Sequence, residues 1–337
     1  MASRVTIYDH FGNYLTEVNA TFRREYKLNE FGSGSFTLST QDQKCREDYL
    51  QFGNFVLVEH EKLPAWGGMI DTPRIWGIGS VTSTAYSAEY ILTTMISDRT
   101  ANMAGVWGSI YQQLVEQMFN NDIGGMVRIG AIYGGGKSVK RTYNYANLYD
   151  EVRKLCKDSG NDFEFLPAID ADGRLFFTAH WHEKRGGLKQ FTLYEDKNIR
   201  LSTSPLREQG RIANRLRIYG PGATFETRGI AKENDIISSG KYGERWLAQL
   251  GQGDDVAANA EQLIIEYANP RKTFDLTAID IDDTFFQCRV GDQFPVSFHS
   301  VGFSGSGFGT TAIVRILQMS YDEQNNVLQL VADEVKA

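Results

Sequence analysis

The sequence predicts a mainly β protein with an α+β insertion, in which two β-barrel-like domains flank a small α/β module. Short apolar segments with a two-residue alternation and frequent turns occupy both ends of the chain, a pattern typical of sandwiches and barrels. Apolar residues in the middle of the chain recur at helical spacing instead. The length of 337 residues is enough for two or three domains.

The first β-barrel-like domain is expected over residues 1–98. The segment 34–39 alternates apolar and polar residues, as in a strand with one buried face. Residues 55–58 are apolar without a break, which indicates a strand covered on both faces. The adjacent Gly67 and Gly68 indicate a bulge or a close backbone contact.

The α/β module is expected over residues 99–187. Its first helix is predicted from apolar residues at helical spacing: Trp107, Ile110, Leu114 and Met118. A second helix begins near Asn144 or Asn147, either of which can cap it. Two alternating apolar runs then meet at Asp172 and Gly173, a dipeptide that favours a hairpin turn.

The second β-barrel-like domain is expected over residues 188–337, and discontinuous segments can contribute to either domain. A strand is predicted at 214–220, and helices are predicted near 240–268. The chain closes with a hairpin that joins 313–319 to 327–331.

Composition narrows the class of protein. Apolar residues make up 42% and charged residues 23%, an ordinary globular balance. Cys45, Cys156 and Cys288 are too scattered for a disulfide framework or a zinc site. No apolar signal-peptide core follows Met1, so we expect synthesis in the host cytoplasm without a leader. The net charge of -7 tells against tight nucleic-acid binding.

A glycine-rich segment, Gly134-Gly135-Gly136-Lys137-Ser138, superficially resembles a phosphate-binding loop. Such a loop needs a glycine five positions before the second one, and Ala131 stands there. It also needs a helix directly afterwards, and none is predicted. The segment is therefore interpreted as a mobile glycine loop, and no nucleotide cofactor is expected.

Three other polar clusters contain residue types that can bind a metal ion. His180-Trp181-His182-Glu183 offers too few ligands to specify zinc. Neither Asp280-Ile281-Asp282-Asp283 nor Asp170-Ala171-Asp172-Gly173 has the spacing of a calcium loop. The sequence predicts no catalytic residue, no metal and no cofactor, and hence a protein that is not an enzyme.

The loop at 302–309 carries Phe303 and Phe308 on a glycine-rich backbone. We expect these two side chains to contact a neighbouring subunit. Contact with a membrane and an ordinary long hairpin loop are the alternatives.

The order of features along the chain resembles the tail-tip and baseplate hub proteins of tailed bacteriophages, which are related to the hub part of type VI secretion spike proteins. The matching segments span almost the whole chain and are residues 34–38, 55–58, 66–70, 214–220, 241–245, 289–292 and 319–322. They include Lys241-Tyr242-Gly243-Glu244-Arg245, Arg289-Val290-Gly291-Asp292 and Met319-Ser320-Tyr321-Asp322.

The resemblance implies a homotrimer whose subunits each supply two similar barrels, giving a pseudo-sixfold ring at the distal end of the phage tail. The ring would join the tail tube to a central tip or fibre protein and pass DNA without binding it specifically. Transient contact with the cell envelope is also implied. A carbohydrate-binding adhesin of the tail tip and a cell-wall hydrolase remain as alternatives, which glycan-array binding and zymography would reveal.

Overall fold

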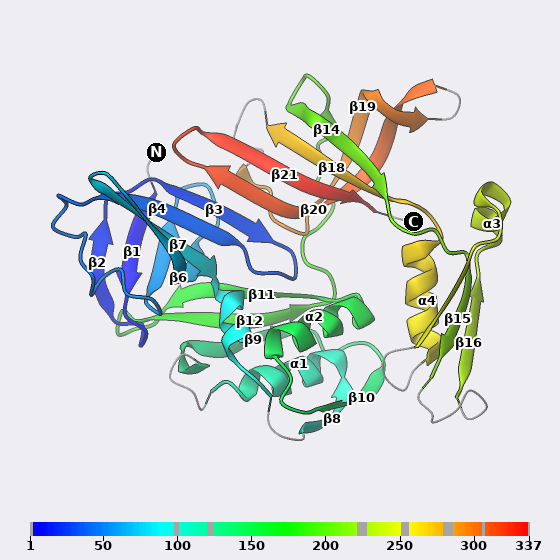
Figure 1. Cartoon of the computed structure of the whole chain (residues 1–337), viewed down its shortest axis with the longest axis horizontal. Coiled ribbons are helices and arrows are strands. Elements are labelled where there is room, and N and C mark those ends of the chain that lie inside the picture. Colours follow the sequence, from blue (N-terminus) through cyan, green and yellow to red (C-terminus); the bar gives the residue numbers. More distant parts are fainter. Residues whose placement is uncertain are drawn as a thin grey trace.

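The computed structural model describes residues 3–97, 101–119, 124–220, 228–250, 256–278, 286–304 and 307–335. Strands dominate this part of the chain (Figure 1). The mainly β class with an α+β insertion is thereby confirmed. None of the helices in the described ranges is both long and apolar enough to cross a bilayer.

The first β half contains seven strands: β1 (Arg4–Tyr8), β2 (Tyr14–Val18), β3 (Phe22–Lys27), β4 (Ser33–Ser39), β5 (Phe55–Glu59), β6 (Trp66–Gly77) and β7 (Ser80–Ser87). They are hydrogen-bonded in the order β3-β4-β7-β6-β5-β1-β2. The rings of Phe22, Phe36 and Trp66 pack together in its core, with Phe22 5.1 Å from Trp66 between ring centroids. Burial alternates along β4 and is continuous over residues 55–58, as the sequence predicts.

Gly67 and Gly68 do not form a bulge, because both pair with β5 in regular register. They allow close packing instead. A Cβ on Gly68 would lie 2.3 Å from the carbonyl oxygen of Tyr86, and one on Gly67 would lie 2.7 Å from Pro167. The bulge in β6 instead lies between Asp71 and Arg74.

The second β half contains β13 (Leu193–Tyr194), β14 (Ile199–Gln209), β18 (Arg271–Ala278), β19 (Gln293–Ser304), β20 (Gly307–Asp322) and β21 (Val327–Glu334). β14, β18, β21 and β20 are neighbours in that order, and β19 pairs with both β20 and β13. Buried aromatic and aliphatic residues such as Phe274, Phe294 and Val314 form its core.

One strand pairing joins the two halves. β3 runs antiparallel to β20, with Lys27 opposite Gln318 and Arg23 opposite Asp322. The ladder therefore continues from one half into the other as a 13-stranded sheet. Among the described strands, no pairing connects the ends of this ladder, so the sheet is open where the sequence suggested barrels.

The α/β module lies against the first half. Its elements are η1 (Ala88–Thr94), β8 (Ala101–Val106), α1 (Trp107–Glu116), η2 (Gly124–Met126), β9 (Val127–Ile132), β10 (Ser138–Tyr143), α2 (Leu148–Ser159), β11 (Asp162–Ile169) and β12 (Leu175–His182). The Asn147 side chain caps α2 by accepting from the amide of Asp150 at 3.3 Å. β11 and β12 form the predicted hairpin, and Phe177 of β12 packs 5.4 Å from Phe55 of β5. The module thus shares a core with the first β half.

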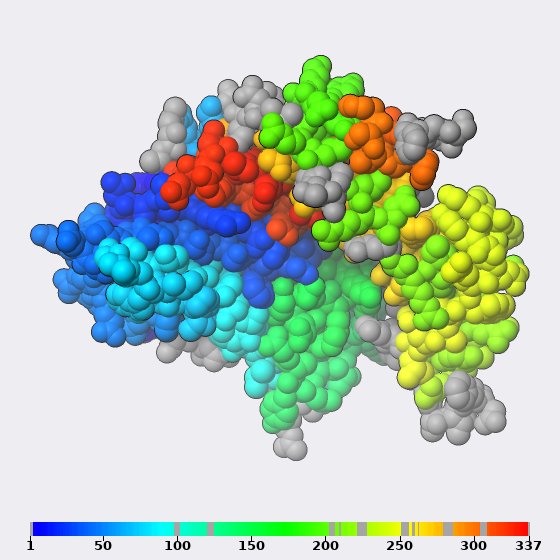
Figure 2. All heavy atoms as spheres, turned by 45° about the horizontal axis from the view of Figure 1, so that its top comes forward, coloured from blue at the N-terminus to red at the C-terminus, as the bar shows by residue number. Residues whose placement is uncertain are grey.

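A further unit interrupts the second half. It contains β15 (Arg215–Tyr219), β16 (Ile230–Asn234), α3 (Ile236–Tyr242), β17 (Trp246–Leu250) and α4 (Val256–Tyr267). The strand expected at 214–220 belongs to this separate three-stranded sheet and does not pair with the main sheet. Leu216 and Ile218 pack against Ala260 and Leu263 of α4, which gives the unit its own small core. It lies at the right-hand end of the molecule in Figures 1 and 2.

Candidate functional site

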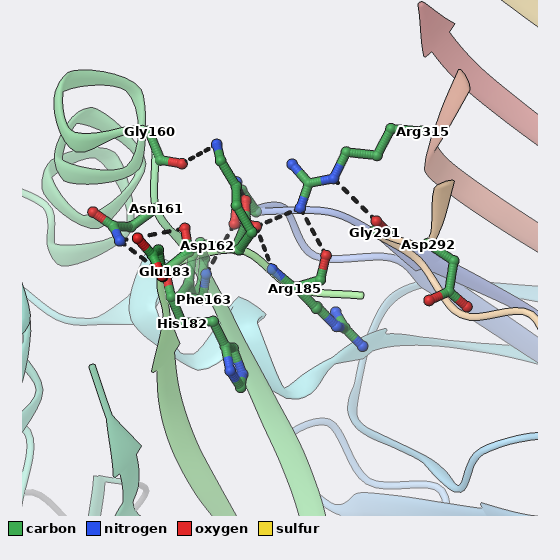
Figure 3. Close-up of polar contacts among 12 residues, drawn as sticks. Gly160, Asn161, Asp162, Phe163, His182, Glu183, Arg185, Gly291, Asp292 and Arg315 are labelled. Carbon is green, nitrogen blue, oxygen red and sulfur yellow. Dashed lines mark hydrogen bonds and ion pairs between the residues drawn. The ribbon is translucent and has the colours of Figure 1, made fainter. Parts of the chain in front are cut away.

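A buried polar junction fixes the α/β module to both β halves, and Asp162 at the start of β11 lies at its centre (Figure 3). The side chain of Asp162 is 2% exposed. Its carboxylate accepts from the side-chain amide of Asn29 at 2.8 Å and from the backbone amide of Arg185 at 2.7 Å. It also forms an ion pair with Arg315 of β20. One carboxylate therefore binds groups from three parts of the chain.

The Arg315 guanidinium joins the second half to the module. Its Nε donates to the carbonyl oxygen of Gly291 at 3.1 Å, and an Nη donates to the carbonyl oxygen of Arg185 at 2.9 Å as well as to Asp162. The planar guanidinium has several donors in a fixed geometry, so it can hold three acceptors at once.

Two glycines allow the backbones to approach at this point. Gly291 has a φ of +95°, and a Cβ there would lie 2.6 Å from the carbonyl oxygen of Arg185. Gly186 has a φ of +79°, and its Cβ would lie 2.3 Å from the carbonyl carbon of Gly291. Only glycine satisfies both the backbone angle and the close approach.

Asp292, the residue after Gly291, adds further contacts to the junction. Its carboxylate accepts from the amides of Gly187 at 3.1 Å and Arg289 at 2.8 Å, and it lies 3.2 Å from Lys189 Nζ. The segment matched to the hub proteins at 289–292 is thus a turn that is closed by its own aspartate.

Glu164 is the second buried carboxylate of β11. It lies 2.9 Å from His182 Nε2 and pairs with Arg185. Burial alone would raise its pKa, but the hydrogen bond from His182 and the charge of Arg185 outweigh burial and hold the pKa below its ordinary value. Glu164 is therefore ionised at neutral pH and belongs to the same ionic network.

Glu89 differs in the sign of its pKa shift. It accepts from Ser87 Oγ at 2.6 Å and from the amide of Phe165 at 3.0 Å. Burial raises its pKa above the ordinary value, and these hydrogen bonds only partly offset that effect. Glu89 and Glu164 both line a small pocket of about 40 Å³ with Lys27 and Arg185. This space suits a water molecule and is far smaller than a typical ligand pocket.

The histidine cluster at 180–183, which offers too few ligands to specify zinc, is part of this packing. The rings of His180 and His182 stack with centroids 5.9 Å apart. His182 contacts Glu164, while His180 Nδ1 accepts from the amide of Ala131 at 3.0 Å. Both histidines therefore have structural partners on β12 and its neighbours.

The glycine loop 134–138 connects β9 to β10, so a strand follows it where a phosphate-binding loop requires a helix. Asp172 and Gly173 form the turn of the β11–β12 hairpin, with Gly173 at a φ of +78°. The acidic run 280–283 lies outside the described residues.

The loop at 302–309 is the end of the β19–β20 hairpin, in which the backbones of Phe303 and Phe308 pair with each other. The Phe303 side chain is 73% exposed. The Phe308 side chain lies outside what the structure describes. Contact of this pair with a neighbouring subunit stays a prediction.

Three solved phage tail proteins share this fold over nearly the whole chain. Prophage tail protein gp18 from Listeria monocytogenes EGD-e matches with a TM-score of 0.63 and 14% identity over 99% of this chain and 95% of its own. The prophage MuSo2 43 kDa tail protein from Shewanella oneidensis matches at 0.61 and 12%, over 98% of both chains. A tail protein from Neisseria meningitidis MC58 matches at 0.59 and 12%, over 100% of this chain and 97% of its own.

A type VI secretion protein has the same fold. The Escherichia coli c3393 protein, a component of that system with structural similarity to the T4 tail proteins gp27 and gp5, matches with a TM-score of 0.52 and 11% identity. The match covers 95% of this chain and 75% of that one. No family model matches the sequence, and no curated protein matches it.

The fold is therefore that of phage tail proteins and their type VI secretion counterparts. At the level of the fold, this likeness confirms the resemblance that the order of sequence segments indicates.

Proposed function

We propose that three copies of this chain form a pseudo-sixfold ring at the distal end of a phage tail, where the ring joins the tail tube to the tip and lines the DNA channel. The observation that carries the proposal is the full-length match to three phage tail proteins. In this proposal the protein is structural and performs no catalysis.

The polar junction supports a structural role. Asp162 and Arg315 join the second β half to the module, and β3 pairs with β20 between the two halves. These contacts hold the two halves rigidly relative to each other. A ring subunit needs such rigidity, because each half must keep a fixed angle to its neighbours for the ring to close. The net charge of -7 favours a lumen through which DNA passes without being held.

The partners in this proposal are two further copies, the distal tail or tube proteins, and a central tip or fibre protein. The location is the virion, at the distal end of the tail, with transient contact to the cell envelope during DNA ejection.

Light scattering joined to negative-stain imaging tests the ring. We expect a species of about 114 kDa, three times the 37.9 kDa of one chain, with a central opening. Assembly depends on concentration, so the measurement covers a dilution series up to high micromolar protein. A particle that remains monomeric throughout, or a trimer without an opening, contradicts the proposal.

A further inference from the structure

The unit of β15, β16, β17, α3 and α4 has one covered and one open sheet face. The strand order is β16-β15-β17, so β17 is an edge strand. Leu216 and Ile218 point to α4, while Trp246 and Leu250 of β17 are 51% and 60% exposed on the other face. α4 lies between this sheet and the rest of the molecule in Figure 1, so the open face is directed outward.

The free edge of β17 has an identifiable set of hydrogen-bonding groups. The carbonyl oxygen of Arg245 accepts from the amide of Arg215 at 3.0 Å, so residue 245 faces β15. Hydrogen-bonding direction alternates along a parallel strand, and the backbone groups of Trp246, Ala248 and Leu250 therefore point to the open edge. No described strand pairs with that edge.

This edge lacks the features that usually protect one. Soluble proteins usually protect edge strands against pairing with another chain by means of charged residues, proline or bulges. β17 reads Trp-Leu-Ala-Gln-Leu, without a charge or a proline, and its register with β15 is regular. The opposite edge strand, β16, carries Lys232 and Glu233. β17 is thus an edge suited to accept another strand.

The side chains beside the edge indicate the chemistry of that strand. Ala248 is small and is flanked on the open face by Trp246 and Leu250. Arg217 lies next to Ala248 on β15, with its guanidinium 4.9 Å from the ring centroid of Trp246. Arg217 forms no ion pair with any described residue, whereas Arg215 pairs with Glu244 at 2.7 Å. Neighbouring strands lie about 4.8 Å apart, so Arg217 can reach across Ala248 to a carboxylate on an added strand.

We propose that β17 accepts an extended segment of a partner protein as an added strand, and that this segment carries an acidic residue between two apolar ones on the face it shares with Trp246 and Leu250. The acidic residue pairs with Arg217, and the apolar residues contact Trp246 and Leu250. A second copy of β17 does not fit this description, because β17 has no acidic residue to offer Arg217. The proposal is independent of the ring, because a single subunit presents the complete edge.

The test uses the full chain and a fluorescein-labelled, capped peptide with the sequence Thr-Val-Thr-Glu-Thr-Val-Thr. Its two valines and its glutamate lie on one face of the added strand. Fluorescence anisotropy is expected to show saturable binding that weakens as salt is added, because a charge pair contributes to it. The same peptide with lysine in place of glutamate is expected to bind about tenfold more weakly, the scale of a hydrogen bond to a charged group.

Two variants separate the backbone contact from the charge contact. Ala248→Pro removes an amide that faces the open edge and leaves the pairing with β15 intact, because edge strands tolerate proline where the amide points outward. We expect about tenfold weaker peptide binding from the lost bond and the blocked approach. Ala248→Thr keeps the amide and is the matched control. Arg217→Glu is expected to reverse the preference between the glutamate and lysine peptides.

Circular dichroism and the thermal midpoint verify that each variant is folded. The proposal is overturned if the parent chain binds neither peptide, or if Ala248→Pro binds as the parent does. It is also overturned if light scattering shows self-association other than the trimer, and Ala248→Pro abolishes that association, because the edge then serves a second copy. None of these outcomes alters the size or opening of the proposed ring, so failure of the two proposals can be told apart.

Discussion

The carboxylate of Asp162 and the guanidinium of Arg315 form an ion pair although 153 positions separate them in the sequence. Their side chains are only 2% and 15% exposed. The pair connects the first strand of the module's hairpin to the long strand β20, which itself pairs with β3. It is the point at which all three main parts of the fold are held together.

Replacing Arg315 by methionine should lower the free energy of unfolding by about 3–5 kcal/mol, because the Asp162 carboxylate then stays buried without its cation. Urea denaturation measures the change. Arg46→Gln is the control, since Arg46 and Asp48 form a pair in which both side chains are more than half exposed, so its loss should have little effect on stability. Equal effects of the two substitutions would contradict a central role for the junction.

Asp162→Asn combined with Arg315→Met forms a double-mutant cycle. We expect the double variant to lose less stability than the sum of the single changes, because the neutral pair leaves no unpaired buried charge. A coupling energy of about 2 kcal/mol is expected for residues in direct contact. Strict additivity would show that the two side chains act separately.

Glu89→Gln should stabilise the protein near neutral pH. Burial raises the pKa of Glu89 above 4.5 in the fold, so the protonated form is favoured by folding. That stability is complete below the unfolded pKa and is lost as pH rises through the folded pKa. Denaturation midpoints measured between pH 4 and pH 8 should therefore differ between the variant and the parent only at the higher pH values.

Glu164→Gln should have the opposite dependence on pH. The folded-state pKa of Glu164 is depressed, so its contribution is present above the unfolded value and is lost as pH falls through the folded one. The variant should be less stable than the parent at neutral pH, and the difference should shrink in acid. The same sign for both glutamates would contradict the opposite directions of their pKa shifts.

Gly291→Ala should destabilise the junction by about 2–3 kcal/mol, since backbone strain at positive φ adds to a collision with the carbonyl of Arg185. Gly79→Ala is the matched control. Gly79 has a φ of +74° but no atom within 4 Å of an added Cβ, so only the strain remains. Thermal unfolding of the two variants separates crowding from strain.

Changing Phe303 and Phe308 together to serine should prevent assembly without unfolding the subunit. Phe303 is 73% exposed in the single chain, so its loss costs little stability there. Light scattering and the thermal midpoint report the two properties. Leu188→Ser is the control for a general loss of apolar surface, because Leu188 lies outside this loop and is 61% exposed. Normal assembly of the double variant would refute the contact.

Local patterns were sufficient to predict many individual elements. The alternation over 34–39, the Asn147 cap and the Asp172–Gly173 turn all involve residues within a few positions of one another. Each is set by backbone preference and by the burial of one face, which are properties of a short segment.

Long-range relationships could not be predicted in this way. Asp162 follows a helix end and resembles a turn residue, and nothing near it points to Arg315. The strand at 215–219 has the alternation of any half-buried strand, so its membership of a separate sheet depends on α4, some forty positions later. Pairing between distant strands depends on tertiary packing, which leaves no local periodicity.

The pairing of β3 with β20 also determines the order in which the sheet can form during synthesis. The side chains of Glu25 on β3 and Gln318 on β20 are hydrogen-bonded although they are 293 positions apart, so the first half leaves the ribosome long before β20 has been synthesised. Until then β3 presents an unpaired edge, and chains released early would keep it. Premature termination near the carboxyl end should therefore yield aggregates more readily than loss of the outlying β15–β17 unit.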